Sequence, residues 1–295
     1  MLGEYAALYE VKPSKPCSPA HGNVGTVTTL LSDGLRSGML REALVVGDAD
    51  SWPWAEARIA RTPDEVEAAA GSKFTFVQYP DALLSLLDTT SAMVGLPCQI
   101  GRTPTPYMRV GLFCGMCLAD DGMKHLLKSL RVDPRNVKSL SYRKPGGGLR
   151  VVLGNGRIVE SAGYSWLAHF FPMRKCLGCR NYTNHFADIS VGDSARRGWS
   201  LVLVRSSRGQ GLLQSAVRRG AIEKTPMTSR ELVLHSMTPL LQKERWRGYR
   251  RSLVVWRLGE WKRRMPLGVL RFIGKSQTAI ESAIKWAWVR IHAWN

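Results

Sequence analysis

Short apolar runs, separated by glycine, proline and polar residues, recur along the first 240 residues of the chain. Ala43–Val46 is one such run, and its β-branched end is typical of a buried strand. Ala92–Val94, Tyr107–Phe113 and Ser200–Val204 repeat the pattern. We also expect strands in the first ten residues and at Ala187–Asp193. None of these runs is long enough to predict a membrane-spanning helix.

Helix signals stand between the predicted strands. Thr62-Pro63-Asp64-Glu65 has a capping residue, then proline at the first helical position, then two acids in the first turn. The stretch Gly22–Leu31 is expected to open a second helix that continues to about Ser37, and further helices are expected at Gly122–Leu130 and Gly209–Arg219. The mixture predicts an α/β (mixed α+β) fold, in which short strands present side chains to a shared site and helices cover them.

Residues 139–171 contain a separate group of signals. Ser139–Arg143 and Leu149–Leu153 have strand patterns, and Gly154-Asn155-Gly156 predicts a hairpin turn directly after the second strand. Tyr164–Phe171 is rich in aromatic residues, and we expect it to be helical.

Charge is the unusual feature of the composition. The 295 residues include 42 Lys or Arg against 23 Asp or Glu, which gives a net charge of +19 and a pI near 10.1. Such an excess favours anionic partners, although it says nothing about the fold. The first ten residues have neither a basic segment nor a long apolar core, so we expect no secretory signal and a cytoplasmic location.

The segment from Glu244 to the end differs from the rest of the chain. It contains twelve Lys or Arg against three Glu, together with six of the ten tryptophans. Basic residues interleaved with tryptophan on predicted helices resemble an interfacial segment, so docking on an anionic membrane surface is one hypothesis. A basic helical pair that packs on the body or on a partner is an equal alternative. Nucleic acid is the less favoured partner, because no RNA-binding module is recognisable.

Six cysteines in a chain without a predicted leader favour metal ligands or reduced thiols over disulfides. Cys114-x-x-Cys117 and Cys176-x-x-Cys179 formally complete a four-cysteine zinc set. Against zinc, the two pairs are far apart, Cys114 ends an apolar strand, and Cys98 would have no role. An iron–sulfur cluster also needs four thiolates and tolerates ligands that are scattered along the chain.

Two small polar stretches have the composition of phosphate-binding turns. Gly25-Thr26-Val27-Thr28 opens a predicted helix, where free backbone N–H groups suit a phosphate. Gly71-Ser72-Lys73 adds a basic side chain to a similar turn. The alternative interpretations are an ordinary capped helix for the first stretch and a plain helix end for the second.

Several motifs in one order resemble a known family. They are Gly25–Leu31, Gly71–Lys73, Gly95-Leu96-Pro97-Cys98-Gln99, Gly111–Cys114, Arg174–Cys179 and Ala187–Asp193. Together they are similar to the coenzyme F420 hydrogenase/dehydrogenase beta-subunit family, which includes 7-hydroxymethyl chlorophyll a reductase. The resemblance covers roughly residues 1–240, and it suggests an N-terminal flavin-binding region at 1–80, a cysteine-cluster region at 81–240 and a basic tail at 241–295.

The resemblance implies FAD beside a [4Fe–4S] cluster. The cluster ligands would be Cys98, Cys114, Cys176 and Cys179, with Cys117 as the alternative fourth ligand. The FAD would lie in a core of short strands covered by helices. Its expected contacts are Asn23, Gly25, Thr26, Thr28, Gly71, Ser72, Lys73, Asp188 and Asp193.

The same resemblance implies an oxidoreductase that passes electrons between the cluster and the flavin. Coenzyme F420 or an organic substrate would exchange the hydride. Since no further ferredoxin-like cysteine run is present, we expect an external electron carrier, and the basic surface suits an acidic ferredoxin. Catalytic side chains are not predicted, because cofactors of this kind carry the chemistry themselves.

One departure and one competing hypothesis accompany this resemblance. Asn23-Val24-Gly25 stands where the family pattern has Ser-Gly-Gly, which alters the expected flavin contacts there. The competing hypothesis is a non-catalytic protein that zinc or a cluster stabilises and that docks on a membrane surface or nucleic acid through its tail.

Overall fold

The computed structural model describes residues 2–15, 25–73, 75–101, 105–141, 148–161 and 170–232, with seven single positions between 269 and 283. Some predictions therefore concern positions outside the described residues. These are the flavin contact at Asn23, residues 164–169 of the expected aromatic-rich helix and most of the basic tail.

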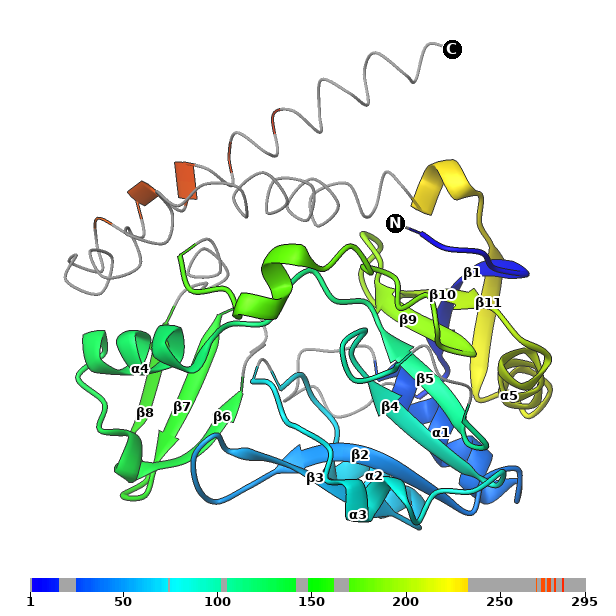
Figure 1. Ribbon diagram of the computed structural model, residues 1–295, viewed down its shortest axis with the longest axis horizontal. Helices are drawn as coiled ribbons and strands as arrows, with labels where there is room; N and C mark the ends of the chain where they lie inside the picture. The colour runs from blue at the N-terminus through cyan, green and yellow to red at the C-terminus, as the bar shows by residue number, and fades with distance from the viewer. Residues whose placement is uncertain are drawn as a thin grey trace.

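An eight-stranded mixed sheet is the largest element of the molecule (Figure 1). Its strand order is β11-β1-β10-β9-β5-β4-β2-β3, and the four strands β9, β5, β4 and β2 run parallel to one another. The strands on either side of this parallel block are antiparallel to their neighbours. The bounds are β1 (Ala7–Pro13), β2 (Glu42–Asp48), β3 (Ala55–Ala60), β4 (Ser91–Gly95), β5 (Met108–Leu112), β9 (Ile189–Asp193), β10 (Ser200–Val204) and β11 (Ile222–Pro226).

Successive side chains of the central strands point to opposite faces of this sheet, and both faces are buried. Val202 and Val204 of β10 pack into one core with α1 (Thr26–Arg36) and α5 (Ser207–Arg218), which contact each other. Leu201 and Leu203 pack on the opposite face. A strand that is covered on both sides has a continuous apolar sequence, which is why these runs were recognisable as strands.

The helix α2 (Pro63–Ala68) forms for the local reason that its sequence predicted. The side chain of Thr62 accepts a hydrogen bond from the backbone of Glu65, and the Glu65 carboxylate accepts one in return from the backbone of Thr62. This capping box pairs two donors of the helix start that would otherwise have no partner. A short helix, α3 (Asp81–Leu84), follows before β4.

A smaller antiparallel sheet lies beside the large one (Figure 1). It consists of β6 (Val137–Ser141), β7 (Leu149–Leu153) and β8 (Ile158–Ser161), and α4 (Asp120–Ser129) shares its apolar core. Trp54, from the connection between β2 and β3, is buried in that core and donates from Nε1 to the carbonyl of Val137 at 3.2 Å. This contact fastens the smaller sheet to the larger one.

The mixed α/β fold is confirmed, and so are the main predicted strands and helices of the described residues. The sequence patterns did not predict β3, β8 and β11. No helix among the described residues is both long and apolar enough to cross a membrane. The described positions of the tail are helical and exposed, with Phe272 at 75% exposure.

Candidate functional site

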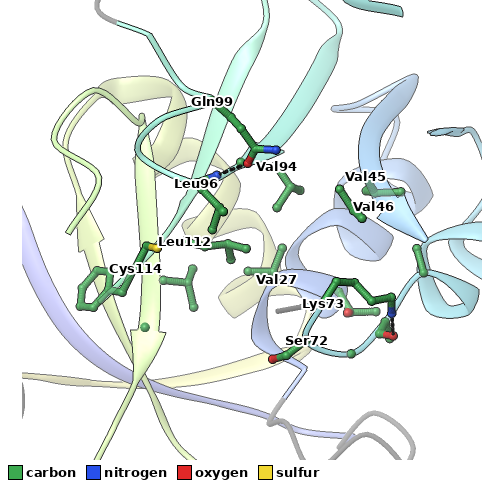
Figure 2. Close-up of a pocket in the computed structure, with 18 of the residues that line it drawn as sticks. Val27, Val45, Val46, Ser72, Lys73, Val94, Leu96, Gln99, Leu112 and Cys114 are labelled. Atoms are coloured by element: carbon green, nitrogen blue, oxygen red, sulfur yellow. Dashed lines mark hydrogen bonds between the residues drawn. The ribbon is translucent and has the colours of Figure 1, made fainter. Parts of the chain in front are cut away.

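A cavity of about 410 Å³ lies at the carboxyl ends of the parallel strands (Figure 2). Each strand of the parallel block contributes residues of its carboxyl half to the wall: Val45 and Val46 from β2, Val94 and Gly95 from β4, Leu112 from β5, and Val191, Gly192 and Asp193 from β9. Ligands of open α/β sheets bind at this edge. The cavity is therefore the candidate site.

The amino end of α1 forms a second wall of the cavity. Gly25 precedes the helix with a φ of 81°, a left-handed conformation that suits glycine. No side chain from the described residues caps this helix start. The Thr26 hydroxyl is buried and already donates to the Ser200 hydroxyl at 2.8 Å, and both residues contribute to the cavity wall. What α1 offers a ligand is therefore the backbone N–H groups and positive dipole of its first turn.

Gly71, Ser72 and Lys73 follow α2 and close the cavity on another side (Figure 2). The side chain of Lys73 is only 8% exposed. Its ammonium lies 3.0 Å from a carboxylate oxygen of Asp48 and donates to the carbonyl of Ala70 at 3.0 Å. A fixed cation thus stands on the cavity wall near the start of α1, where an anionic group of a ligand would be stabilised.

Aromatic residues line the cavity next to the cysteines. Phe113 and Tyr182 lie with their ring centroids 5.3 Å apart, and both line the cavity. The ring of Phe113 occupies the space beside Gly192 that a side chain at that position would need. Gly192 therefore allows the aromatic wall to approach β9, and Asp193 follows it as an exposed residue of the lining.

Three segments bring the described cysteines together. Cys98 lies in the turn after β4 and is exposed, while Cys114 and Cys117 follow β5 and line the cavity. Cys176 belongs to a short 3₁₀ helix, Arg174–Gly178, and Cys179 follows it directly. The backbone N–H of Cys117 points at Cys176 Sγ, 3.4 Å away, so the two Cys-x-x-Cys pairs are in contact.

The pKa shifts show that these thiols affect one another. A hydrogen bond with Cys114 and burial both raise the pKa of Cys117, and the charges of Cys176 and Cys98 add to this effect. Burial raises the pKa of Cys98, which the charge of Lys175 opposes and those of Cys114 and Cys179 reinforce. Five thiols therefore share one environment, in which the pKa values of Cys98 and Cys117 are both raised.

The donor set can be tested against two kinds of metal centre. Within the described ranges, no three His, Cys, Asp or Glu side chains converge as they would around one metal ion. A four-iron cluster places each thiolate on a different iron, so its ligands surround a larger volume. Several soft thiols spread over three neighbouring segments fit such a cluster better than they fit one zinc ion.

Lys175 links the cysteines to the cavity rim. Its ammonium lies 3.0 Å from the ring centroid of Phe76, which is in the segment that follows Lys73. The same ammonium favours the charged form of Cys98. An anionic centre held by these thiols would have a cation beside it.

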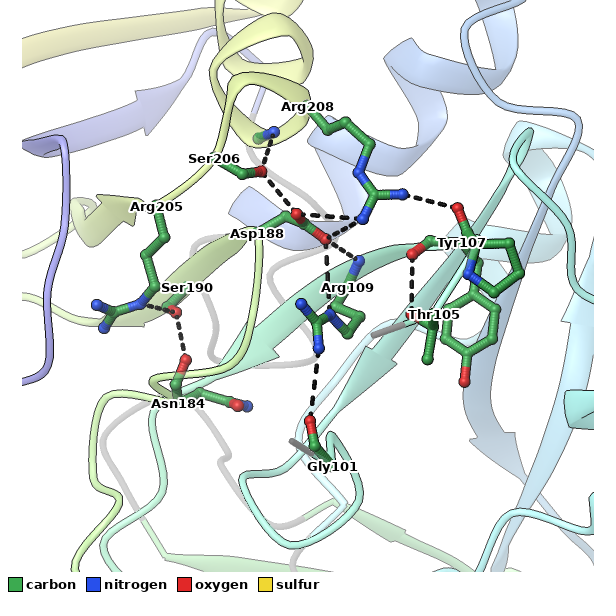
Figure 3. Close-up of polar contacts among 12 residues, drawn as sticks. Gly101, Thr105, Tyr107, Arg109, Asn184, Asp188, Ser190, Arg205, Ser206 and Arg208 are labelled. Atoms are coloured by element: carbon green, nitrogen blue, oxygen red, sulfur yellow. Dashed lines mark hydrogen bonds and ion pairs between the residues drawn. The ribbon is translucent and has the colours of Figure 1, made fainter. Parts of the chain in front are cut away.

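Asp188 lies away from the cavity that the other described cofactor contacts line. It precedes β9, at the end of the sheet opposite the cavity, and is buried (Figure 3). Its carboxylate accepts hydrogen bonds from the backbone of Arg109 at 2.8 Å and from the Ser206 hydroxyl at 2.6 Å, and it forms an ion pair with Arg208 at 3.4 Å. These contacts join β9 to β5 and α5.

Most of the other predicted contacts line the cavity, whereas several lining residues were not predicted. Gly25, Thr26, Thr28, Gly71, Ser72, Lys73 and Asp193 all contribute to the described wall. Sequence reasoning missed Phe113, Tyr182 and the amide of Gln99, although Gln99 belongs to the Pro-Cys-Gln motif. Its side chain accepts from the backbone of Leu96 at 2.6 Å and donates to the carbonyl of Val77 at 2.7 Å, which fixes the Cys98 turn to the cavity rim (Figure 2).

Two family profiles match successive parts of the chain. Residues 15–84 match the N-terminal region of the coenzyme F420 hydrogenase/dehydrogenase beta subunit. Residues 88–230 match the C-terminal region of the same subunit. The two matches meet between α3 and β4, and together they include the cavity and all five described cysteines.

Individual proteins and structures agree with these matches. The coenzyme F420 hydrogenase subunit beta of Methanococcus voltae is 26% identical over 216 residues, which are 64% of this chain and 73% of that protein. The chloroplastic 7-hydroxymethyl chlorophyll a reductase of Oryza sativa subsp. japonica is 26% identical over 255 residues, which are 77% of this chain and 53% of that protein. A chain of the F420-reducing [NiFe] hydrogenase complex from Methanosarcina barkeri has the same fold, with a TM-score of 0.65 and 19% identity over 83% of this chain and 91% of its own.

Proposed function

The chain belongs to the coenzyme F420 hydrogenase/dehydrogenase beta-subunit family, and from this premise we propose that it is an iron–sulfur flavoprotein oxidoreductase. The observation that carries the proposal is that cysteine residues line the cavity. Cys114 and Cys117 line the cavity wall, and the backbone N–H of Cys117 contacts Cys176 Sγ on a neighbouring segment. A cluster held there would be adjacent to whatever the cavity binds.

Cys98, Cys114, Cys176 and Cys179 are the proposed cluster ligands. Cys98 is the exposed member, so electrons would enter or leave at its side of the site. Cys117 is the alternative ligand, but it is buried, and its backbone already donates to Cys176. Backbone N–H groups that point at ligating sulfurs stabilise the negative charge on a cluster.

FAD is the proposed occupant of the cavity. When it is bound, a flavin exchanges a hydride with an organic partner and single electrons with an iron–sulfur centre. The first turn of α1 and the Gly71–Lys73 turn would hold the diphosphate, because both supply positive potential on the same wall. Asp193, which is exposed at the end of β9, would accept a hydrogen bond from a sugar hydroxyl.

The chain's own residues would control access and orientation. Val45, Val94 and Leu112 give the sheet side of the cavity an apolar surface that excludes water from a flat ring system. Tyr79 lines the same wall, but its hydroxyl donates to the carbonyl of Val94, and burial raises its pKa, so it is held as a neutral positioning group. We infer no proton transfer by a side chain.

The proposed partners follow from this chemistry. Coenzyme F420 or another organic hydride carrier would meet the cofactor at the open side of the cavity. An acidic one-electron carrier such as a ferredoxin would meet the cluster beside Cys98, where Arg174, Lys175 and Arg180 are exposed. Complementary charge of this kind raises the association rate of the two proteins.

Anaerobic purification of the full chain tests the proposal. The expected result is a coloured protein with flavin and cluster absorption and with FAD that can be released. At full occupancy it would contain about four iron and four sulfide per chain. A colourless protein with stoichiometric zinc would overturn the redox proposal and favour the non-catalytic alternative.

Docking on a membrane surface through the tail is a second and separate proposal. Val269, Phe272 and Ile273 are exposed large apolar side chains, and the surrounding sequence is strongly basic. This combination favours partition to an anionic interface. Flotation with anionic liposomes is expected for the full chain and is expected to be lost when residues 244–295 are removed. Unchanged flotation of the shortened chain would reject the proposal.

A further inference from the structure

Asn184 is a buried polar residue at the centre of the cysteine-bearing segments. It lies five residues beyond Cys179, is 0% exposed and has a φ of 61°. Asparagine is one of the few residues other than glycine that adopts this left-handed conformation readily. Both the backbone and the burial show that this side chain is held in one orientation.

The amide of Asn184 reaches the ends of two strands. Its Nδ2 atom donates to the carbonyl of Gly95 at 2.8 Å and lies 3.5 Å from the carbonyl of Leu112. Gly95 ends β4 three residues before Cys98, and Leu112 ends β5 two residues before Cys114. Both partners are acceptors, so the donor end of the amide has to face them. The other end, Oδ1, is buried without a hydrogen-bond partner among the described residues.

The neighbours of Asn184 hold it in this position. The Ser190 hydroxyl donates to its backbone carbonyl at 3.2 Å, and Arg205 Nε donates to that hydroxyl at 3.3 Å (Figure 3). Gly111 leaves the space for it, because a β-carbon there would lie 2.7 Å from Asn184 Cγ. The side chain is therefore a fixed link between β4, β5 and the segment that follows Cys179.

We infer that Asn184 is the positioning residue of the thiolate site, since one side chain joins the three segments that carry Cys98, Cys114 and Cys179. The ends of β4 and β5 are already paired in the sheet, so what the amide adds is to fix the segment that carries Cys179 against them, and with it the third thiol against the first two. The inference rests on the proposed cluster, although the geometry it describes belongs to the protein alone. Partners that orient metal ligands typically contribute about 10-fold or more to metal retention.

Two matched variants of the full chain test this inference. Asn184→Gly removes the amide and keeps a residue that accepts the left-handed backbone. Asn181→Ala is the control, because Asn181 lies in the same loop and its side chain accepts only a local hydrogen bond, from the backbone of His185 at 2.8 Å, among the bonds described for it. Iron retention against a chelator and the electron paramagnetic resonance spectrum of the reduced protein are measured for both variants. Disulfide cross-linking of Cys98 to Cys179 in the metal-free protein is measured by mass spectrometry after mild oxidation.

Asn184→Gly is expected to lose iron about 10-fold more readily, to show a changed spectrum and to cross-link less, whereas Asn181→Ala matches the original chain. Equal retention, spectrum and cross-linking in the Asn184→Gly variant would overturn the inference. A chain without any cluster would contradict the proposed function, and the cross-linking comparison would still decide the role of Asn184. If the Asn184→Gly variant does not fold, Asn184→Ser is used in its place, because a serine side chain cannot reach both carbonyls.

Discussion

The ring of Phe113 lies against the backbone of Gly192, in the space that a β-carbon at that position would fill. Gly192→Ala is therefore expected to push Phe113 away from β9 and into the cavity. Overpacking of this kind destabilises a protein by about 1–3 kcal/mol. The free energy of unfolding, measured in urea, and the flavin content per chain should both fall.

Gly211→Ala is the control for this prediction. Gly211 lies within α5, and no described atom lies within 4 Å of the place where its β-carbon would stand. Alanine in an open helical position is expected to raise stability by about 0.5–1 kcal/mol. If both alanine variants changed stability in the same direction, the contact between Phe113 and Gly192 would not be the cause.

Lys73 supplies a nearly buried positive charge to the cavity wall, so Lys73→Gln is expected to weaken FAD binding by about 1.5–3 kcal/mol. The loss should be large for FAD and small for riboflavin, which has no diphosphate. Equilibrium titration of the flavin-free protein with each ligand measures the difference.

Asp48→Asn provides the matched comparison. It removes the carboxylate that lies 3.0 Å from the Lys73 ammonium but leaves the ammonium in place. FAD affinity is expected to be unchanged or higher. Equal weakening in both variants would mean that the ion pair and not the cation supports binding.

The cysteines are expected to divide into two classes. Replacement of Cys98, Cys114, Cys176 or Cys179 by serine should abolish most of the cluster absorption, because each of these substitutions removes a proposed ligand. Cys117→Ser should keep the cluster, since its backbone N–H and not its thiol contacts Cys176. Iron and sulfide analysis after anaerobic reconstitution measures this. Retention in Cys114→Ser together with loss in Cys117→Ser would exchange the roles of these two residues.

His125 gives the folded chain a pH dependence in the mildly acidic range. Burial, and next the charge of Lys128, lower its pKa from the ordinary value of 6.5, and its ring stacks on Phe171. As pH falls below 6.5, the unfolded chain binds this proton before the folded chain does, so stability falls until the lowered pKa is passed. His125→Phe retains an aromatic ring beside Phe171 and should flatten the decline in urea midpoint between neutral and mildly acidic pH. An unchanged decline would assign the effect to other groups.

Local chemistry accounts for the predictions that held. The helix start at Thr62-Pro63-Asp64-Glu65 is set by neighbouring residues, so the capping box was visible in the sequence. The strands β4 and β10 are fully buried and therefore have continuous apolar sequences. In contrast, β3 and β11 are the edges of the large sheet, and partly exposed polar residues interrupt their pattern.

The arrangement of the site depends on strand geometry and on contacts between residues distant along the chain, which the local sequence pattern does not show. Asp188 and Asp193 are close in sequence, but an extended strand of five residues spans roughly 17 Å, so they lie at opposite ends of β9. The partners of Asn184 are 89 and 72 residues away, and the sequence pattern around it carries no sign of either contact. Cys98 and Cys114 could be grouped because both follow strands whose carboxyl ends share one edge.

The position of β1 has a consequence for how the chain is made. This strand precedes every other strand of the large sheet in the chain, yet both of its neighbours, β10 and β11, come from the last part of that sheet. During translation both hydrogen-bonding edges of β1 therefore remain unpaired until β10 has left the ribosome, and one edge remains unpaired until residue 226 has. Assembly of the sheet in this order is necessarily late, and a polypeptide interrupted before Ser200 would expose β1 to pairing with other chains.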